Sequence, residues 1–180
     1  DKLTLDSKSN VNLQPSGIIV FQVTVKKLSA VIANSSGDMF AEPLAGETFD
    51  VSLNASGNVT LKDLQLKKFL INSNGSGNVR IDNITADDVQ IRLDASGKIE
   101  ISGETASLKV DSNGSGDVLA GDLQASKTDV NAQASGDVTV WAVDTLDVTI
   151  EGSGNVDYYG KPKVTQNLTA SGALRSQGDK

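Results

Sequence analysis

The sequence has no cysteine and no histidine, and only 4% of its 180 residues are aromatic. The missing side chains exclude disulfides, thiol nucleophiles, imidazole bases and the usual zinc ligands. The scarcity of aromatic residues predicts a narrow core built from aliphatic side chains. We therefore expect no metal site, no cofactor site and no catalytic residues.

The sequence also lacks the features of a nucleic-acid-binding or membrane-spanning chain. Its formal net charge of −7 would repel a polyanion. No apolar run approaches the roughly eighteen residues of a membrane-spanning helix. Residues 1–4 do not begin like a signal peptide, which is compatible with a secreted product from which a signal has been removed.

Glycine, in contrast, is abundant and recurs in the dipeptide Ser-Gly at a nearly constant interval. Successive copies lie 18 to 20 residues apart. A repeat of this length is typical of a solenoid, in which each unit stacks on the next. Glycine suits a corner in each unit because it adopts positive φ without steric cost. The repeated glycines are Gly17, Gly37, Gly57, Gly77, Gly97, Gly116, Gly136, Gly154 and Gly172.

Apolar and polar residues alternate at fixed distances from each repeated glycine. Val89, Ile91 and Leu93, for example, stand eight, six and four residues before Gly97. Such alternation is typical of strands with one buried face. The seventh residue after the glycine is also predicted to face inward, at Leu44, Leu64, Ile84, Leu123 and Val143.

We therefore predict an all-β fold, a parallel β-helix-like solenoid with about 20 residues per rung and about nine rungs. It forms one domain over residues 1–180, with a cap at 1–12, repeats at 13–172 and a C-terminal tail at 173–180. Each unit is predicted to contain two short strands and a corner at Ser-Gly. An antiparallel sandwich has no reason to keep this period, and a calcium-binding β-roll repeats every nine residues.

Outward residues on neighbouring rungs lie about 4.8 Å apart in such a stack, so their identities predict contacts. Surface ion pairs of about 0 to 1 kcal/mol each are expected across rungs. The pairs are Arg80 with Glu100, Lys98 with Asp117, and Arg92 with Asp111.

Asp117 and Asp137 also occupy equivalent positions on neighbouring rungs. Their expected separation is near the one that a retaining glycosidase needs. Any solenoid with acidic residues in one column produces this spacing, and no cluster of basic residues for an acidic sugar accompanies them. The pattern favours a solvated acidic face over a catalytic pair.

Three aromatic residues near the end of the repeats are candidates for a ligand platform. Trp141 and Tyr159 stand five residues after their glycines on consecutive units, and Tyr158 lies beside them. Stacked aromatic side chains can hold a sugar ring or a partner surface. The alternative is that they seal the end of the solenoid or form an oligomer contact there, because an open strand edge invites pairing.

Several motifs resemble a known family, the putative auto-transporter adhesin, head GIN domain family. They are residues 54–59 (Asn-Ala-Ser-Gly-Asn-Val), 113–118 (Asn-Gly-Ser-Gly-Asp-Val), 152–162 (Gly-Ser-Gly-Asn-Val-Asp-Tyr-Tyr-Gly-Lys-Pro) and 169–172 (Thr-Ala-Ser-Gly). The likeness covers residues 45 to 178 well and is poor before residue 45. It implies a right-handed β-helix-like fold in a secreted or cell-surface bacterial protein with no established enzymatic activity.

We accordingly expect a non-enzymatic adhesin, located outside the cell, at its surface or in the periplasm, that presents a polar face to a glycan or protein ligand. Two alternatives stay open. One is a polysaccharide-active enzyme of the pectinase kind, which rests on fold analogy alone. The other is a structural envelope protein whose chains assemble through the ends of the solenoid.

Overall fold

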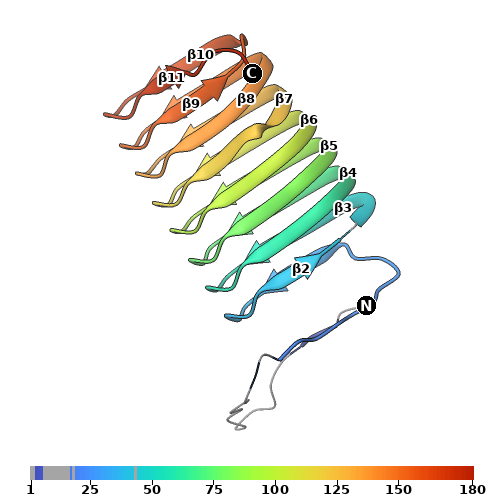
Figure 1. Cartoon of the computed structure of the whole chain (residues 1–180). Helices are drawn as coiled ribbons and strands as arrows, with labels where there is room; N and C mark the ends of the chain where they lie inside the picture. Colours follow the sequence, from blue (N-terminus) through green and yellow to red (C-terminus); the bar gives the residue numbers. More distant parts are fainter. Residues whose placement is uncertain (1–2, 6–16, 18, 43) are drawn as a thin grey trace.

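The computed structural model describes residues 3–5, 17, 19–42 and 44–180, and all regular structure in them is β-strand. Figure 1 shows the strands lying side by side in a stack of turns. The strands are β1 (Ala30–Ala33), β2 (Met39–Ala41), β3 (Leu44–Leu53), β4 (Val59–Ser73), β5 (Val79–Leu93), β6 (Ile99–Ser112), β7 (Val118–Ala132), β8 (Val138–Ile150), β9 (Val156–Tyr159), β10 (Lys163–Leu168) and β11 (Leu174–Ser176).

Each turn pairs in parallel with the equivalent part of the next turn. The longest run of pairs joins β4 to β5, where Val59 lies opposite Val79 and Ile71 opposite Ile91. These partners are twenty residues apart, as the repeat requires. The predicted parallel solenoid is confirmed.

The corner glycines form a file along one edge of the stack. A Cβ atom added to Gly77 would overlap the carbonyl oxygen of Gly57, and one added to Gly97 would overlap that of Gly77. The reason expected for these glycines was wrong, since none of them has positive φ. Glycine is needed here because the backbones of successive turns approach too closely for a side chain.

A second corner lies inside the long strands, six residues after the corner glycine. Asp63 has φ of 53° and Asn83 has φ of 66°. Gly103 stands at the same distance from its glycine and has φ of 131°, but a register shift places it opposite Ile84. Asn, Asp and Gly are the residues that adopt positive φ most readily. The two short strands predicted for each unit are therefore one strand of up to 15 residues that bends at this point.

The solenoid has about seven turns instead of the nine predicted. A Cβ at Gly37 meets only the Ser35 hydroxyl and one at Gly17 meets nothing within 4 Å, so stacking begins at the step from Gly37 to Gly57. Among residues 17 and 19–29 no strand is present. The cap predicted at 1–12 lies outside the described residues except for 3–5.

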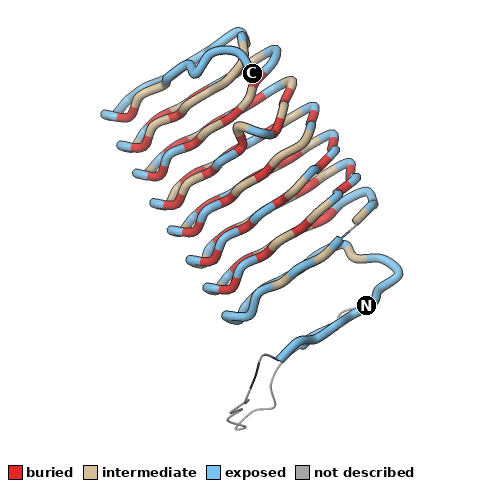
Figure 2. Tube along the Cα trace, viewed as in Figure 1, coloured by how far each residue is buried: buried red, intermediate tan, exposed pale blue. Residues whose placement is uncertain are grey.

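The core is a continuous column of mostly aliphatic side chains inside the stack, and Figure 2 shows buried residues alternating with more exposed ones along the strands of its middle turns. The stacked rings of Phe49 and Phe69, with centroids 6.1 Å apart, lie toward its N-terminal end. Val143, predicted to face inward, is 39% exposed, and Ala142 is buried instead. The turn from Gly136 to Gly154 has only 18 residues. The pairing of β7 with β8 shifts register within it, between Val140 and Trp141 and again between Ala142 and Thr145.

Candidate ligand-binding site

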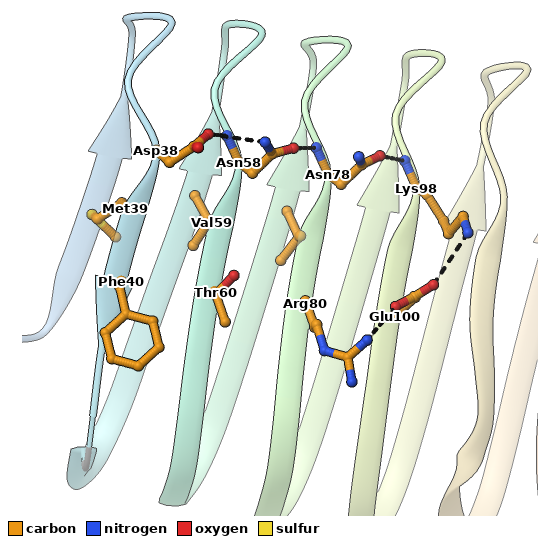
Figure 3. Close-up of a pocket in the computed structure, with 11 residues that line it drawn as sticks. Asp38, Met39, Phe40, Asn58, Val59, Thr60, Asn78, Arg80, Lys98 and Glu100 are labelled. Atoms are coloured by element: carbon orange, nitrogen blue, oxygen red, sulfur yellow. Dashed lines mark hydrogen bonds and ion pairs between the residues drawn. The ribbon is translucent and has the colours of Figure 1, made fainter. Parts of the chain in front are cut away.

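A ladder of hydrogen bonds follows the outward position next to the corner glycines (Figure 3). Asp38 Oδ1 accepts the backbone N–H of Asn58 at 2.8 Å, and Asn58 Oδ1 accepts that of Asn78 at 3.0 Å. Asn78 Oδ1 in turn accepts the backbone N–H of Lys98 at 2.9 Å. The hydrogen bond from Asn58 lowers the pKa of Asp38. Each of these side chains ties its own corner to the next one.

The two carboxylates considered as a catalytic pair belong to a second run of the same ladder. Asp117 Oδ1 accepts the backbone N–H of Asp137 at 3.0 Å. Asp137 Oδ1 accepts the backbone N–H of Asn155 at 2.7 Å and its side-chain amide at 3.1 Å. The arrangement favours a structural role for both carboxylates, since each holds the following turn.

We expect Asp137→Ala to lower the free energy of unfolding by about 1 kcal/mol, because it removes the acceptor for the N–H of Asn155. Asp137→Asn should stay within about 0.5 kcal/mol of the parent chain, since an amide oxygen serves as acceptor at Asn58 and Asn78. Urea unfolding followed by circular dichroism measures both. Equal losses for the two variants would contradict a role as hydrogen-bond acceptor.

A groove of about 530 Å³ runs beside the ladder at the N-terminal end of the stack (Figure 3). Phe40 lines it and is 57% exposed. Arg80 also lines it and pairs with Glu100 on the next turn at 2.9 Å, which confirms that predicted ion pair. The ammonium group of Lys98 lies 3.1 Å from Glu100, so its predicted pairing with Asp117 is wrong.

Arg92 also pairs along its own strand instead of across to Asp111. Its Nε lies 2.6 Å from Asp94, two residues further on. Side chains at i and i+2 of a strand point to the same face, and a long guanidinium side chain spans that distance. The hydrogen bond from Arg92 lowers the pKa of Asp94, and a second hydrogen bond from Asn113 at 2.7 Å acts in the same direction.

Trp141 and Tyr159 lie opposite each other on the neighbouring strands β8 and β9. Both are half-buried and occupy outward positions, since the residues next to Trp141, Val140 and Ala142, are buried. Tyr158 alternates to the other face and packs against the core. The structure therefore brings together two of the three aromatic residues that the sequence singled out.

Glycines lie next to both rings, and Gly121 leaves room for that of Tyr159. A Cβ at Gly121 would lie 3.2 Å from Cε2 of Tyr159 and 3.0 Å from Cγ2 of Thr139. A Cβ at Gly160 would overlap the carbonyl oxygen of Ala142 and lie 3.5 Å from Cδ1 of the Trp141 ring. The Tyr159 ring thus lies across the β7–β8 surface, against a position that has no side chain.

The residues after β11 close over this aromatic surface. The Lys180 ammonium group lies 4.9 Å from the centroid of Tyr159 and 5.7 Å from that of Trp141. It donates a hydrogen bond to the carbonyl oxygen of Gly121 at 2.5 Å and pairs with Asp122. This contact could not be predicted from the sequence, because 58 residues separate Lys180 from Asp122 and the repeat does not relate them. A hollow of about 340 Å³ opens beside it.

Among the residues that the structure describes, no group of three or more acidic side chains gathers closely enough to hold a metal ion. Within the same residues, no helix has the length and apolar character needed to cross a membrane.

Residues 1–79 and 51–162 match the family described as putative auto-transporter adhesin, head GIN domain. The chain belongs to this family. Its match includes residues 1–44, where the resemblance drawn from the motifs was poor. No curated protein matches this family member.

Three solved structures are similar to this member of the adhesin family. A putative adhesin from Parabacteroides distasonis ATCC 8503 has a TM-score of 0.78 and 27% identity, over 83% of this chain and 64% of that one. A putative lipid binding protein from the same organism has a TM-score of 0.69 and 30% identity, over 78% of this chain and 56% of that one. A putative adhesin from Bacteroides fragilis NCTC 9343 has a TM-score of 0.75 and 19% identity, over 84% and 93%, and shows the fold alone.

The chain thus spans a little over half of one Parabacteroides protein and under two thirds of the other. What the whole proteins of this family bind is therefore a matter for proposal.

Proposed function

We propose that the protein is a non-enzymatic adhesin of the bacterial cell surface that binds its ligand through outward side chains of the solenoid. The observation that carries this proposal is the pair of outward aromatic rings, Trp141 and Tyr159, on neighbouring strands of a rigid sheet. Membership of an adhesin family supports it.

The rings suit a binding role because they combine apolar area with a fixed position. Their strands are held by the parallel ladder, and Gly121 leaves the space that the Tyr159 ring occupies. Aromatic side chains in such settings supply much of the binding free energy of protein surfaces, at a small entropic cost.

Binding to surfaces coated with mucin or with fibronectin tests the proposal. The double variant Trp141→Ala with Tyr159→Ala should lose at least about tenfold in apparent affinity. Phe40→Ala is the matched control, since it removes an exposed ring from the groove at the opposite end of the stack. Unchanged binding in the double variant, or no binding by the parent chain to either coat or to a glycan array, would contradict the proposal.

The two alternatives predict different measurements. A polysaccharide-active enzyme would release reducing or unsaturated sugar ends from pectin and lose this activity in Asp117→Asn or Asp137→Asn. A self-assembling envelope protein would show a mass that rises with concentration in light scattering. The adhesin proposal expects no release of sugar ends and does not require assembly.

A further inference from the structure

The aromatic site already holds a ligand-like group, the ammonium of Lys180. The contacts of this group come from three sides: the faces of Trp141 and Tyr159, the Gly121 carbonyl oxygen and the Asp122 carboxylate. The Lys180 side chain keeps 34% exposure, the lowest among the cations of the ion pairs in the described residues. This lysine is therefore partly covered and is held at the site by several contacts at once.

The chemistry of the contacts selects a particular kind of group. Aromatic faces attract a cation through their quadrupole. The Gly121 carbonyl and the Asp122 carboxylate are hydrogen-bond acceptors, so they require N–H donors on that cation. A quaternary ammonium has no N–H, and a neutral hydroxyl lacks the charge. A primary alkylammonium group satisfies all of these contacts together.

Gln177 is tied to Tyr158 and Asp157 by hydrogen bonds, and the two residues between it and Lys180 have one polar contact each to the neighbouring turn. Gly160 donates its backbone N–H to the Gly178 carbonyl at 2.9 Å, and Lys161 pairs with Asp179 at 2.5 Å. The side chains of that ion pair are 82% and 62% exposed, so solvent screens the attraction. Displacing Lys180 from the rings thus breaks few buried contacts.

We propose that the site formed by Trp141, Tyr159, Gly121 and Asp122 binds the lysine side chain of a partner protein, and that Lys180 occupies it when no partner is bound. The inference rests on the proposed adhesin function and names its ligand. The partner group is taken to be a lysine because the group that occupies the site in this chain is itself a lysine ammonium. The bound lysine replaces an equivalent group, so the site is formed before the partner arrives.

Trp141 is the only tryptophan in the chain, so its fluorescence reports on this site directly. The probe is Nα-acetyl-lysine amide, titrated into the parent chain and into Lys180→Ala. We expect a saturable change in both, at least about fivefold tighter in Lys180→Ala, because the internal competitor is gone. Lys163→Ala, which removes an exposed lysine of β10, is the matched control and should behave as the parent chain.

Three further measurements test the selectivity of the site in the Lys180→Ala background. Nα-acetyl-norleucine amide, which has the stem without the charge, and the trimethyl-lysine analogue should each bind at least about fivefold more weakly than the lysine probe. Adding Asp122→Asn should weaken the lysine probe by a similar factor without changing the unfolding midpoint, since Asp122 is 74% exposed. Equal binding of all three probes, or no gain on removing Lys180, would overturn the inference.

Failure of this inference is distinguishable from failure of the proposed function. If the parent chain binds fibronectin through Trp141 but acetylation of the lysines of fibronectin leaves that binding unchanged, the adhesin proposal stands and the lysine ligand is wrong. If acetylation abolishes binding that also depends on Trp141, both are supported. If the lysine probe saturates but neither coated surface is bound, the site takes an ammonium group and the adhesin proposal fails.

Discussion

Gly97→Ala should lower the free energy of unfolding by about 3 kcal/mol or more, although it adds a single methyl group. The new Cβ would overlap the carbonyl oxygen of Gly77 and lie 3.1 Å from its carbonyl carbon. The clash is with backbone, which cannot change rotamer, and Gly116 packs against the carbonyl of Gly97 from the next turn. A local shift is therefore opposed on both sides. Urea unfolding monitored by circular dichroism gives the loss.

Gly46→Ala provides the control for this prediction. Gly46 lies in β3, and a Cβ added there meets no atom within 4 Å. Its substitution should change the free energy of unfolding by no more than about 0.5 kcal/mol. If Gly97→Ala were as mild as Gly46→Ala, the turns would not be in the close contact that the glycine file describes.

The position of the glycine file could be predicted from the sequence because residues one period apart stack on one another in a solenoid. The repeated glycines share one feature, their place in the turn, and they become neighbours only when the turns stack, as Gly57, Gly77 and Gly97 do. The period did not reveal why they are glycine. Positive φ and close backbone approach both favour glycine, and only the coordinates distinguish the two causes.

The second corner and the ladders were missed although their signals were present. Asp63, Asn83 and Gly103 stand six residues after their glycines, a position where residues tolerant of positive φ recur. Asn58 and Asn78 likewise recur one residue after theirs. Polar residues at repeated outward positions were interpreted as a solvated face, because hydropathy does not distinguish a side chain in water from one that accepts a backbone N–H.

The aromatic site could be predicted in part. The period placed Trp141 and Tyr159 on neighbouring strands, as the structure has them. It also grouped Tyr158 with them, although alternation along β9 sends that ring to the core. Lys180 could not be predicted, because the bend that carries it back to Asp122 obeys no repeat. Local departures from the period were the general source of error, as at the shortened turn that exposes Val143.

Phe69→Ala should lower the free energy of unfolding by about 3 to 5 kcal/mol, the range for removing a buried aromatic ring. Phe69 is fully buried, and its ring stacks on Phe49 at an interplanar angle of 6°. The neighbouring turns are fixed by the parallel ladder on both sides of β4, so the core cannot collapse into the space that the ring leaves. Thermal and urea unfolding measure the change.

Phe40→Ala is the control that distinguishes the loss of a buried aromatic ring from the loss of an exposed one. Phe40 lies on β2 and is 57% exposed, so its removal should change the free energy of unfolding by less than about 1 kcal/mol. The same inward packing applies to the next turn. Ile91→Ala, one turn along the same inward column as Ile71, should lose about 2 to 5 kcal/mol by the same reasoning. Comparable losses for Phe69→Ala and Phe40→Ala would mean that the inward column does not hold the turns together.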